Sequence, residues 1–278
     1  MFLTALAPNL LAVDLIAKSS GHIISWGEWA GVMLPLMIPL FLITPWLAYV
    51  VYPPSQKSSP EAPAWASEEL KELGAITFKE YLMAGLATIA LVLWIFNKEF
   101  GVDSTTVAIS IVSIMVLTNV ITWDDLISNK AAFDVLIWFS SLVAMASGLQ
   151  KVGVLTWIGA NTQEMLSGMS PTTLIVSLLV FFFLLHYFFA SVTAHVTALI
   201  PIFMAIAINL LTPEQIVPFT VILAGSLGVM GIITPYGTGP SPIWYGAGYI
   251  SQGRWWALGA IFGTLYLSVI ILGAFIFI

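Results

Sequence analysis

Long apolar segments alternate with short polar strings along most of this chain of 278 residues. A helix that crosses a bilayer needs about 20 predominantly apolar residues, and many of these segments approach that length. They predict membrane-spanning helices at 29–51, 81–97, 105–122, 132–148, 172–190, 195–211, 215–233 and 255–278, with an amphipathic piece at 151–163. The pattern predicts an all-α fold, a polytopic membrane helix bundle.

The one substantial polar connection is 52–80, which is Pro/Ser-rich at first and then amphipathic around the string SEELKEL. It carries lysines that favour a cytoplasmic position, since Lys and Arg are enriched on that side of a membrane. The span before it, 29–51, contains three prolines, Pro35, Pro39 and Pro45. Prolines disrupt soluble helices, but neighbouring helices in a membrane bundle can satisfy the carbonyls that they free.

Composition supports a membrane protein and narrows its partners. Hydrophobic residues make up 59% of the chain and charged residues 8%, against roughly a quarter charged in an average soluble domain. The net charge of −6 comes mostly from acids in the polar stretches 61–80 and 99–125. The few basic residues are scattered, so no nucleic-acid partner is expected. The chain has no cysteine, which excludes disulfides and Cys-ligated metals.

Two strings interrupt apolar sequence where a helix would otherwise continue. The first, 234–242, contains three prolines and two glycines in nine residues and cannot be helical throughout. Unwound backbone at membrane depth is tolerated where it lines a watery cavity, and discontinuous helices form the sites of many transporters. The second string, 190–195, places small and hydroxyl residues before His195. An ionisable residue inside a span is a functional candidate by default.

Other polar residues have simpler interpretations. His186 stands alone in a strongly apolar run and is interpreted as structural or interfacial, and His22 as a solvated turn residue. Asp124 and Asp125 follow Trp123 in a short turn, which is typical of a solvated interface or a helix cap. An intramembrane enzyme is disfavoured, because neither an HExxH nor a GxSxG string occurs.

The opening string 4–12 has a small-residue, Pro-containing pattern similar to that of 237–243. Paired breaks in two halves of a transporter point to a binding site at the interface between repeats. The chain resembles the divalent anion:sodium symporter superfamily. The segments that carry this resemblance are 1–12, 24–54, 121–149, 190–203 and 231–250. The chain is most similar to the branch of bacterial citrate/succinate and tartrate/succinate antiporters and plastid 2-oxoglutarate/malate translocators.

This resemblance implies two inverted repeats, each with a hairpin tip facing a broken helix. Residues 1–20 would end the first repeat, 21–51 would be a transmembrane helix, 52–80 a cytoplasmic linker and 81–278 the second repeat. The chain would then be the C-terminal part of a protein nearly twice as long. The expected substrate-binding residues are Ser191, Val192 and Thr193 with His195 at the hairpin tip, Thr234, Gly237, Thr238, Gly239, Pro240 and Ser241 at the second break, and Ala5, Pro8 and Asn9 at the first.

The chain departs from the family pattern at Val192, which stands where the family has an asparagine. Because His195 follows about one helical turn later, we hypothesise that its protonated ring supplies the positive charge that the symporters obtain from sodium. The function implied is secondary transport of di- or tricarboxylates such as citrate, succinate, malate, tartrate or 2-oxoglutarate by anion exchange. The alternatives are sodium-coupled symport, with an ion near Ser191 and Gly237, and a channel or complex subunit.

The expected partners are small carboxylate anions, the lipid bilayer and, for a full-length form, a second copy in a homodimer. No enzymatic activity, resident cofactor or metal is expected apart from the sodium alternative. The expected location is the bacterial inner membrane, with the plastid inner envelope as the alternative.

Overall fold

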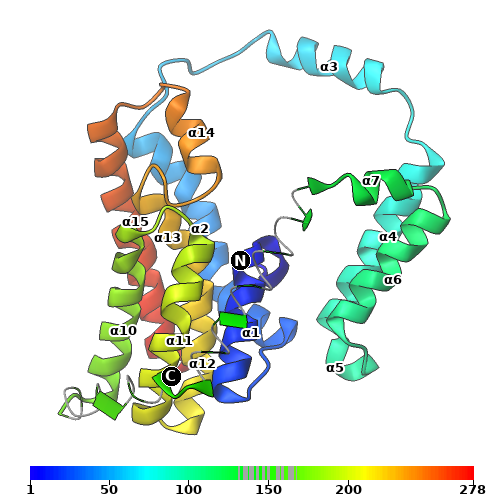
Figure 1. Ribbon diagram of the computed structural model, residues 1–278. Coiled ribbons are helices and arrows are strands. Elements are labelled where there is room, and N and C mark those ends of the chain that lie inside the picture. Colours follow the sequence, from blue (N-terminus) through cyan, green and yellow to red (C-terminus); the bar gives the residue numbers. More distant parts are fainter. Residues whose placement is uncertain are drawn as a thin grey trace. The chain divides into compact units, whose positions relative to one another are not determined.

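The computed structural model describes residues 1–130 and 168–278 throughout, and between them only 132–133, 137, 141, 144–145, 148, 151–154, 157, 160–161 and 166. The predicted span at 132–148 and the amphipathic piece at 151–163 lie outside the continuously described residues and stay predictions. In the two continuous ranges the regular secondary structure is entirely helical (Figure 1). The predicted all-α class is confirmed.

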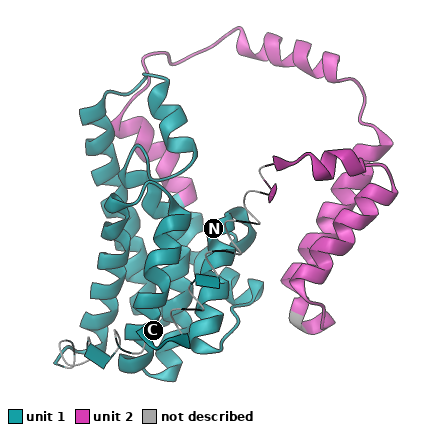
Figure 2. Ribbon diagram, viewed as in Figure 1, with its two compact units in different colours: residues 1–40, 134–278 teal, residues 41–133 magenta. Residues whose placement is uncertain are grey.

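The chain forms two compact units, which Figure 2 distinguishes by colour. Unit 1 contains 1–40 and 134–278, and unit 2 contains 41–133. Helix α2 begins in unit 1 and ends in unit 2. The predicted division at 20, 51 and 80 into repeats and a linker is a statement about ancestry and symmetry, and it stays a prediction.

The helices of unit 1 come from both ends of the chain. They are η1 (Leu3–Ala5), α1 (Ala7–Ser20), α2 (Trp26–Val51), α10 (Pro171–Leu185), η2 (His186–Phe188), α11 (Val192–Leu210), α12 (Pro213–Gly225), α13 (Leu227–Met230), η3 (Gly231–Ile233), α14 (Pro240–Gly246) and α15 (Gln252–Phe277). Those of unit 2 are α3 (Ala62–Leu73), α4 (Phe78–Ile95), α5 (Asn97–Phe100), α6 (Ser104–Leu117) and α7 (Trp123–Ile127).

Within the described residues, six helical segments are long and apolar enough to cross a membrane. They are Trp26–Val51, Phe78–Ile95, Pro171–Phe188, Val192–Leu210, Pro213–Ile233 and Gln252–Phe277. Each coincides with a span predicted from the apolar pattern, and α6 is a shorter apolar helix where 105–122 was predicted. Helix α2 is continuous through its three prolines, as a membrane bundle permits.

Small residues allow the helices of unit 1 to approach closely. Lipid gives no hydrophobic drive between spans, so close packing at glycines takes its place. A Cβ atom on Gly225 of α12 would overlap Met33 of α2, and one on Gly273 of α15 would overlap Leu36 of α2. Gly259 of α15 lies so near η3 that an added Cβ would be 3.0 Å from the carbonyl oxygen of Ile232. These glycines bring α2, α12, α15 and η3 together.

The polar residues at the helix ends mostly have local roles. Thr122 and Asp125 form a reciprocal capping box at the start of α7. Hydrogen bonds from Thr122 hold the pKa of the Asp125 carboxyl below its usual range, which agrees with a helix cap and not with a proton-sharing pair. The turn before α2 corrects one expectation: His22 is half-buried, with its Nε2 atom 3.6 Å from Oε1 of Glu28.

We predict that Gly259→Leu destabilises the full-length protein by about 2 kcal/mol, because backbone carbonyls, which cannot rotate away, occupy the space that the side chain needs. Thermal unfolding in detergent measures the effect. Gly253→Leu is the matched control on the same helix, since an added Cβ there meets nothing within 4 Å. Equal unfolding temperatures for the two variants would show that α15 does not depend on this close approach.

Candidate functional site

The string 234–242 lies against the η2 segment that directly precedes the string 190–195 in unit 1. The Nε2 atom of His186, at the start of η2, is 3.0 Å from the carbonyl oxygen of Gly237. Because a carbonyl only accepts, Nε2 carries the hydrogen and donates it. A second bond joins the neighbours of these two residues: the Tyr236 hydroxyl donates to the Tyr187 carbonyl oxygen at 2.9 Å. We call these two bonds the clasp.

Both segments leave helical geometry, and for 234–242 the reason is visible in the sequence. After η2 the backbone is extended at Phe189 and again at Ser191, and α11 begins at Val192. After η3 the backbone is extended at Thr234, immediately before Pro235. Pro disfavours helical conformation in the residue that precedes it, so the helix ends there. Residues 234–239 form a turn between η3 and α14.

The turn lies alongside α15, inside the length of that span. Gly259, which contacts the carbonyls of Ile232 and Ile233, is seven residues from the start of α15, or roughly 10 Å along its axis. Nearer the helix start, the Trp256 ring lies 6.0 Å from that of Tyr187 and 6.2 Å from that of Tyr236. Trp and Tyr prefer the membrane interface, so the turn belongs just inside the aromatic boundary.

Gly237 is required by the space around it. A Cβ atom there would lie 2.6 Å from the Thr234 Oγ1 atom and 2.7 Å from His186 Nε2. Any side chain would therefore separate the imidazole from the carbonyl that it binds. Gly237 and Thr234, two of the predicted site residues, are thus brought together with His186.

His195 is fully buried one turn into α11. The centroid of its ring lies 4.4 Å from that of Phe182, 5.1 Å from that of Phe189 and 5.1 Å from that of His186. Within the described part of the chain neither ring nitrogen has a hydrogen-bond partner. An ionised imidazole here would need a negative neighbour, and these ring contacts supply none.

The unpartnered nitrogens of His195 belong to a larger set. Thr234 is also fully buried, and neither its hydroxyl oxygen nor the Nδ1 atom of His186 has a partner among the described residues. Buried polar atoms are paired in the great majority of native structures, and exceptions call for an explanation such as a ligand, an ion or a water. Three side chains from three elements therefore leave hydrogen-bonding capacity unused in one place.

The start of α11 is open to an anion. Ser191 occupies the N-cap position, is exposed, and makes no side-chain bond to the first turn. The amides of that first turn have no intrahelical partner, and a helix N-terminus favours negative charge. Thr193 is half-buried beside them, while Val192 is buried and contributes an apolar side chain.

The remaining predicted residues of the second break are more exposed than Thr234 and Gly237. Thr238 and Ser241 are half-buried, and their hydroxyl oxygens are 2.6 Å apart. Gly239 and Pro240 are exposed. The two hydroxyls satisfy each other in this arrangement, and either can turn toward a bound anion.

The first break is organised by Asn9. Its side-chain amide nitrogen is 3.3 Å from the Leu3 carbonyl oxygen, and its Oδ1 atom has no partner in the described part of the chain. Pro8 is buried and Ala5 exposed. Among the described residues no hydrogen bond links this break directly to residues 234–241. It is joined to the hairpin through α1, which packs along α11.

The sequence predicts a structural or interfacial role for His186, and the predicted site does not include it. The structure shows it at the point where η2 meets the turn 234–239. A lone histidine in a fully apolar run is the sequence feature that points to such a role, since burial without a partner is costly. Its partner, a backbone carbonyl 51 residues away, has no sequence signature.

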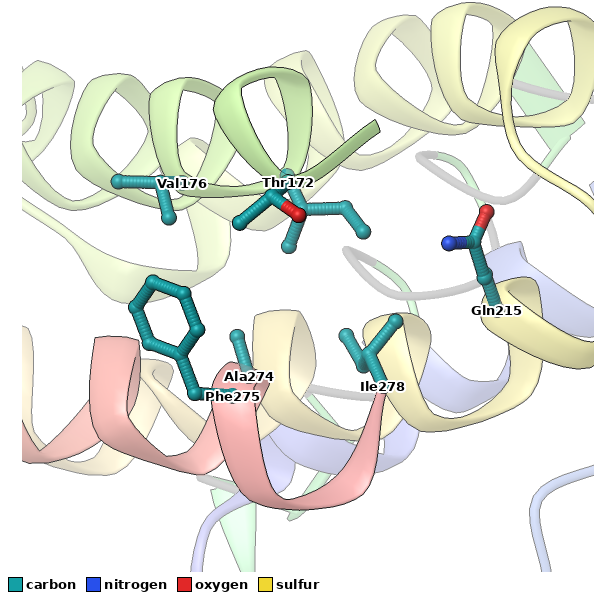
Figure 3. A pocket seen from close by; sticks show the side chains of 7 residues that line it. Thr172, Val176, Gln215, Ala274, Phe275 and Ile278 are labelled. Carbon is teal, nitrogen blue, oxygen red and sulfur yellow. The ribbon is translucent and has the colours of Figure 1, made fainter. Parts of the chain in front are cut away.

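A separate cavity of about 210 Å³ lies at the other end of α15 (Figure 3). Its lining is mainly apolar, with one hydroxyl and one amide: Thr172, Ile175, Val176, Gln215, Ala274, Phe275 and Ile278. Fifteen residues, or roughly 22 Å of helix, separate Ala274 from Gly259. Among the described residues, the lining includes no predicted site residue and no basic side chain to attract an anion.

Spans broken at a shared polar site define the class of protein as a helical membrane transporter. The family model described as the sodium:sulfate symporter transmembrane region matches residues 1–277. L-tartrate/succinate antiporters of Escherichia coli K12, Shigella flexneri and Shigella boydii serotype 4 are each 47% identical over 273 residues. Those matches cover 98% of this chain and 55% of each relative.

The chain belongs to the sodium:sulfate symporter family, as the resemblance in its motifs implied. It is a multi-pass integral protein of the inner membrane, and its relatives are transporters, not enzymes. The chain spans about half the length of the relatives that it matches.

We predict that His195→Leu leaves the thermal stability of the full-length protein unchanged or raises it by about 1 kcal/mol, because it removes two buried nitrogens that lack partners. His186→Leu is the matched comparison and should destabilise by about 1–3 kcal/mol, since it strands the Gly237 carbonyl. Unfolding of both variants in detergent checks the contrast. A large loss of stability in His195→Leu alone would mean that its nitrogens are bonded after all.

Proposed function

We propose that the full-length protein exchanges small di- or tricarboxylate anions across the inner membrane and that this chain supplies one side of the binding site. Tartrate and succinate are the first candidates, because the relatives are named for them. Citrate, malate and 2-oxoglutarate are chemically close candidates. They differ in hydroxyls and carboxylates, so the shape of the pocket decides among them.

The observation that carries this proposal is the meeting of two broken segments at buried polar atoms without partners. Each such atom costs about 1–3 kcal/mol when it is left unsatisfied. A structure that keeps several of them together gains when a polar ligand arrives. A dicarboxylate supplies several acceptors at once, and hydroxyl and amide donors match it.

The donors fall into two groups in this arrangement. Ser191 and Thr193 present hydroxyls beside the free amides of α11, and Thr234, Thr238 and Ser241 present hydroxyls from the turn. One carboxylate would be held by each group. The predicted residues of the first break, Ala5, Pro8 and Asn9, would approach the anion from the α1 side of α11.

Under this proposal, a carboxylate of the bound substrate is the negative group that pairs with the His195 ring. No negative group contacts its ring in the described part of the chain, so a protonated imidazole would be stabilised only when the anion is bound. The positive charge and the substrate would then enter the buried site together. This arrangement supports exchange without a cation gradient.

Sodium-coupled symport is the alternative, because the family includes sodium-coupled members. The Thr234 hydroxyl and the Gly231 carbonyl both lie close to Gly237 and are oxygen ligands of the kind that a hard cation prefers. A sodium ion near Gly237 and Ser191 would use them. The experiment below separates the two modes.

We predict that full-length protein in succinate-loaded vesicles takes up labelled tartrate at the same rate when external sodium is replaced by choline. His195→Gln should slow this exchange at least tenfold and remove its dependence on pH over about pH 5–8, the range in which histidine changes charge. Initial uptake rates, normalised to protein in the vesicles, measure both effects. Among the described residues, His186 is the titratable group whose ring faces that of His195, so its variants are run beside it.

Tyr249→Phe is the matched control, because Tyr249 is 82% exposed and lies outside the site. Uptake that requires external sodium and also occurs into vesicles without internal succinate would show sodium-coupled symport and contradict exchange. Uptake of neither tartrate nor succinate would exclude both as substrates, and unchanged rates in His195→Gln would remove the charge hypothesis.

A further inference from the structure

The clasp joins two consecutive residues on one segment to two consecutive residues on another. His186 binds Gly237 through its side chain, and Tyr187 receives a bond from the side chain of Tyr236. One bond therefore starts from each segment and ends on the backbone of the other. Two bonds in opposite directions fix both the separation and the orientation of the segments.

The Gly237 carbonyl needs a hydrogen-bond donor from another segment of the chain. It lies in the turn between η3 and α14, where no helical ladder satisfies the backbone. Main-chain polar groups buried in a membrane protein are costly when unpaired. Among the described residues, the Nε2 hydrogen of His186 is the side-chain donor at hydrogen-bonding distance.

We propose that His186 is a positioning residue of the carboxylate site: through Gly237 it holds the turn 234–239 in the shape that presents Thr234 to the anion. This role rests on the proposed function. His186 itself does not contact the substrate. It sets the distance between the hydroxyls of the turn and the first turn of α11, the two groups of donors that share one anion.

The space around Gly237 leaves little room for the His186 ring or the Thr234 hydroxyl to move. The hypothetical Cβ of Gly237 is closest to the two atoms that matter, Thr234 Oγ1 at 2.6 Å and His186 Nε2 at 2.7 Å. The same glycine therefore sets how near the imidazole comes and where the hydroxyl stands. A shift of the imidazole would move the hydroxyl of Thr234 with the turn.

His186 also connects the turn to the hairpin. Its ring contacts that of His195, which lies one turn inside α11. The path from the donors of the turn to those of α11 thus runs through Gly237, His186 and His195, each in direct contact with the next. A polar substitution at His186 that keeps the protein folded is therefore expected to weaken binding of the anion.

The test compares His186→Gln with His186→Asn in the full-length protein. The amide nitrogen of Gln reaches about the position of the imidazole Nε2 atom, whereas that of Asn is one methylene short. Asn should raise the half-saturation concentration for succinate about tenfold, equivalent to the loss of roughly 1.4 kcal/mol of binding. Gln should restore it to within about threefold of the wild type, and the maximal rate per folded protein should change little in either.

Tyr236→Phe removes the second bond of the clasp and should raise the half-saturation concentration by about threefold. Tyr249→Phe, outside the clasp, should leave it unchanged. Equal effects of Gln and Asn, or a wild-type half-saturation concentration in Asn, would overturn the positioning role while wild-type exchange still supports the proposed function. A wild-type protein that exchanges no carboxylate would overturn the proposed function itself.

Discussion

Backbone that leaves helical geometry inside a bilayer must find hydrogen-bond partners within the protein, and this constraint shapes the whole of unit 1. The Gly237 carbonyl is exposed by the turn between η3 and α14, and the imidazole of His186 satisfies it. At the first break, Asn9 does the same for the carbonyl of Leu3. Water would meet these needs in a soluble protein, but a membrane protein must place a side chain there.

The glycines of unit 1 meet a second constraint of the bilayer, which is that the helices must pack closely. Without a hydrophobic drive between spans, helices are held by close contact, and side chains of any size prevent it. Gly259 lets α15 touch the carbonyls that end η3, and Gly225 and Gly273 admit α2. The close approach of α15 places the turn 234–239 within the length of that helix. Polar atoms without partners there gain most from binding a polar ligand.

Much of this arrangement could be predicted from the apolar pattern. The six spans of the described residues and the positions of both breaks follow from run length, from Pro and Gly, and from hydroxyl residues in apolar surroundings. The predicted site residues Thr234, Gly237 and His195 lie around His186. The clasp could not be predicted, because its partners are separated by 51 residues in one bond and 49 in the other, and both acceptors are backbone carbonyls.

The sequence by itself determined the class of the protein, the helices and the places where they stop, because each depends on hydropathy and backbone preference over one short stretch. The tertiary structure alone decided which stops face each other and what His186 does. Those outcomes depend on distances between elements far apart in the chain, and a residue type does not encode its distant neighbour. A histidine in an apolar run only says that a partner is needed, and the folded bundle provides the Gly237 carbonyl.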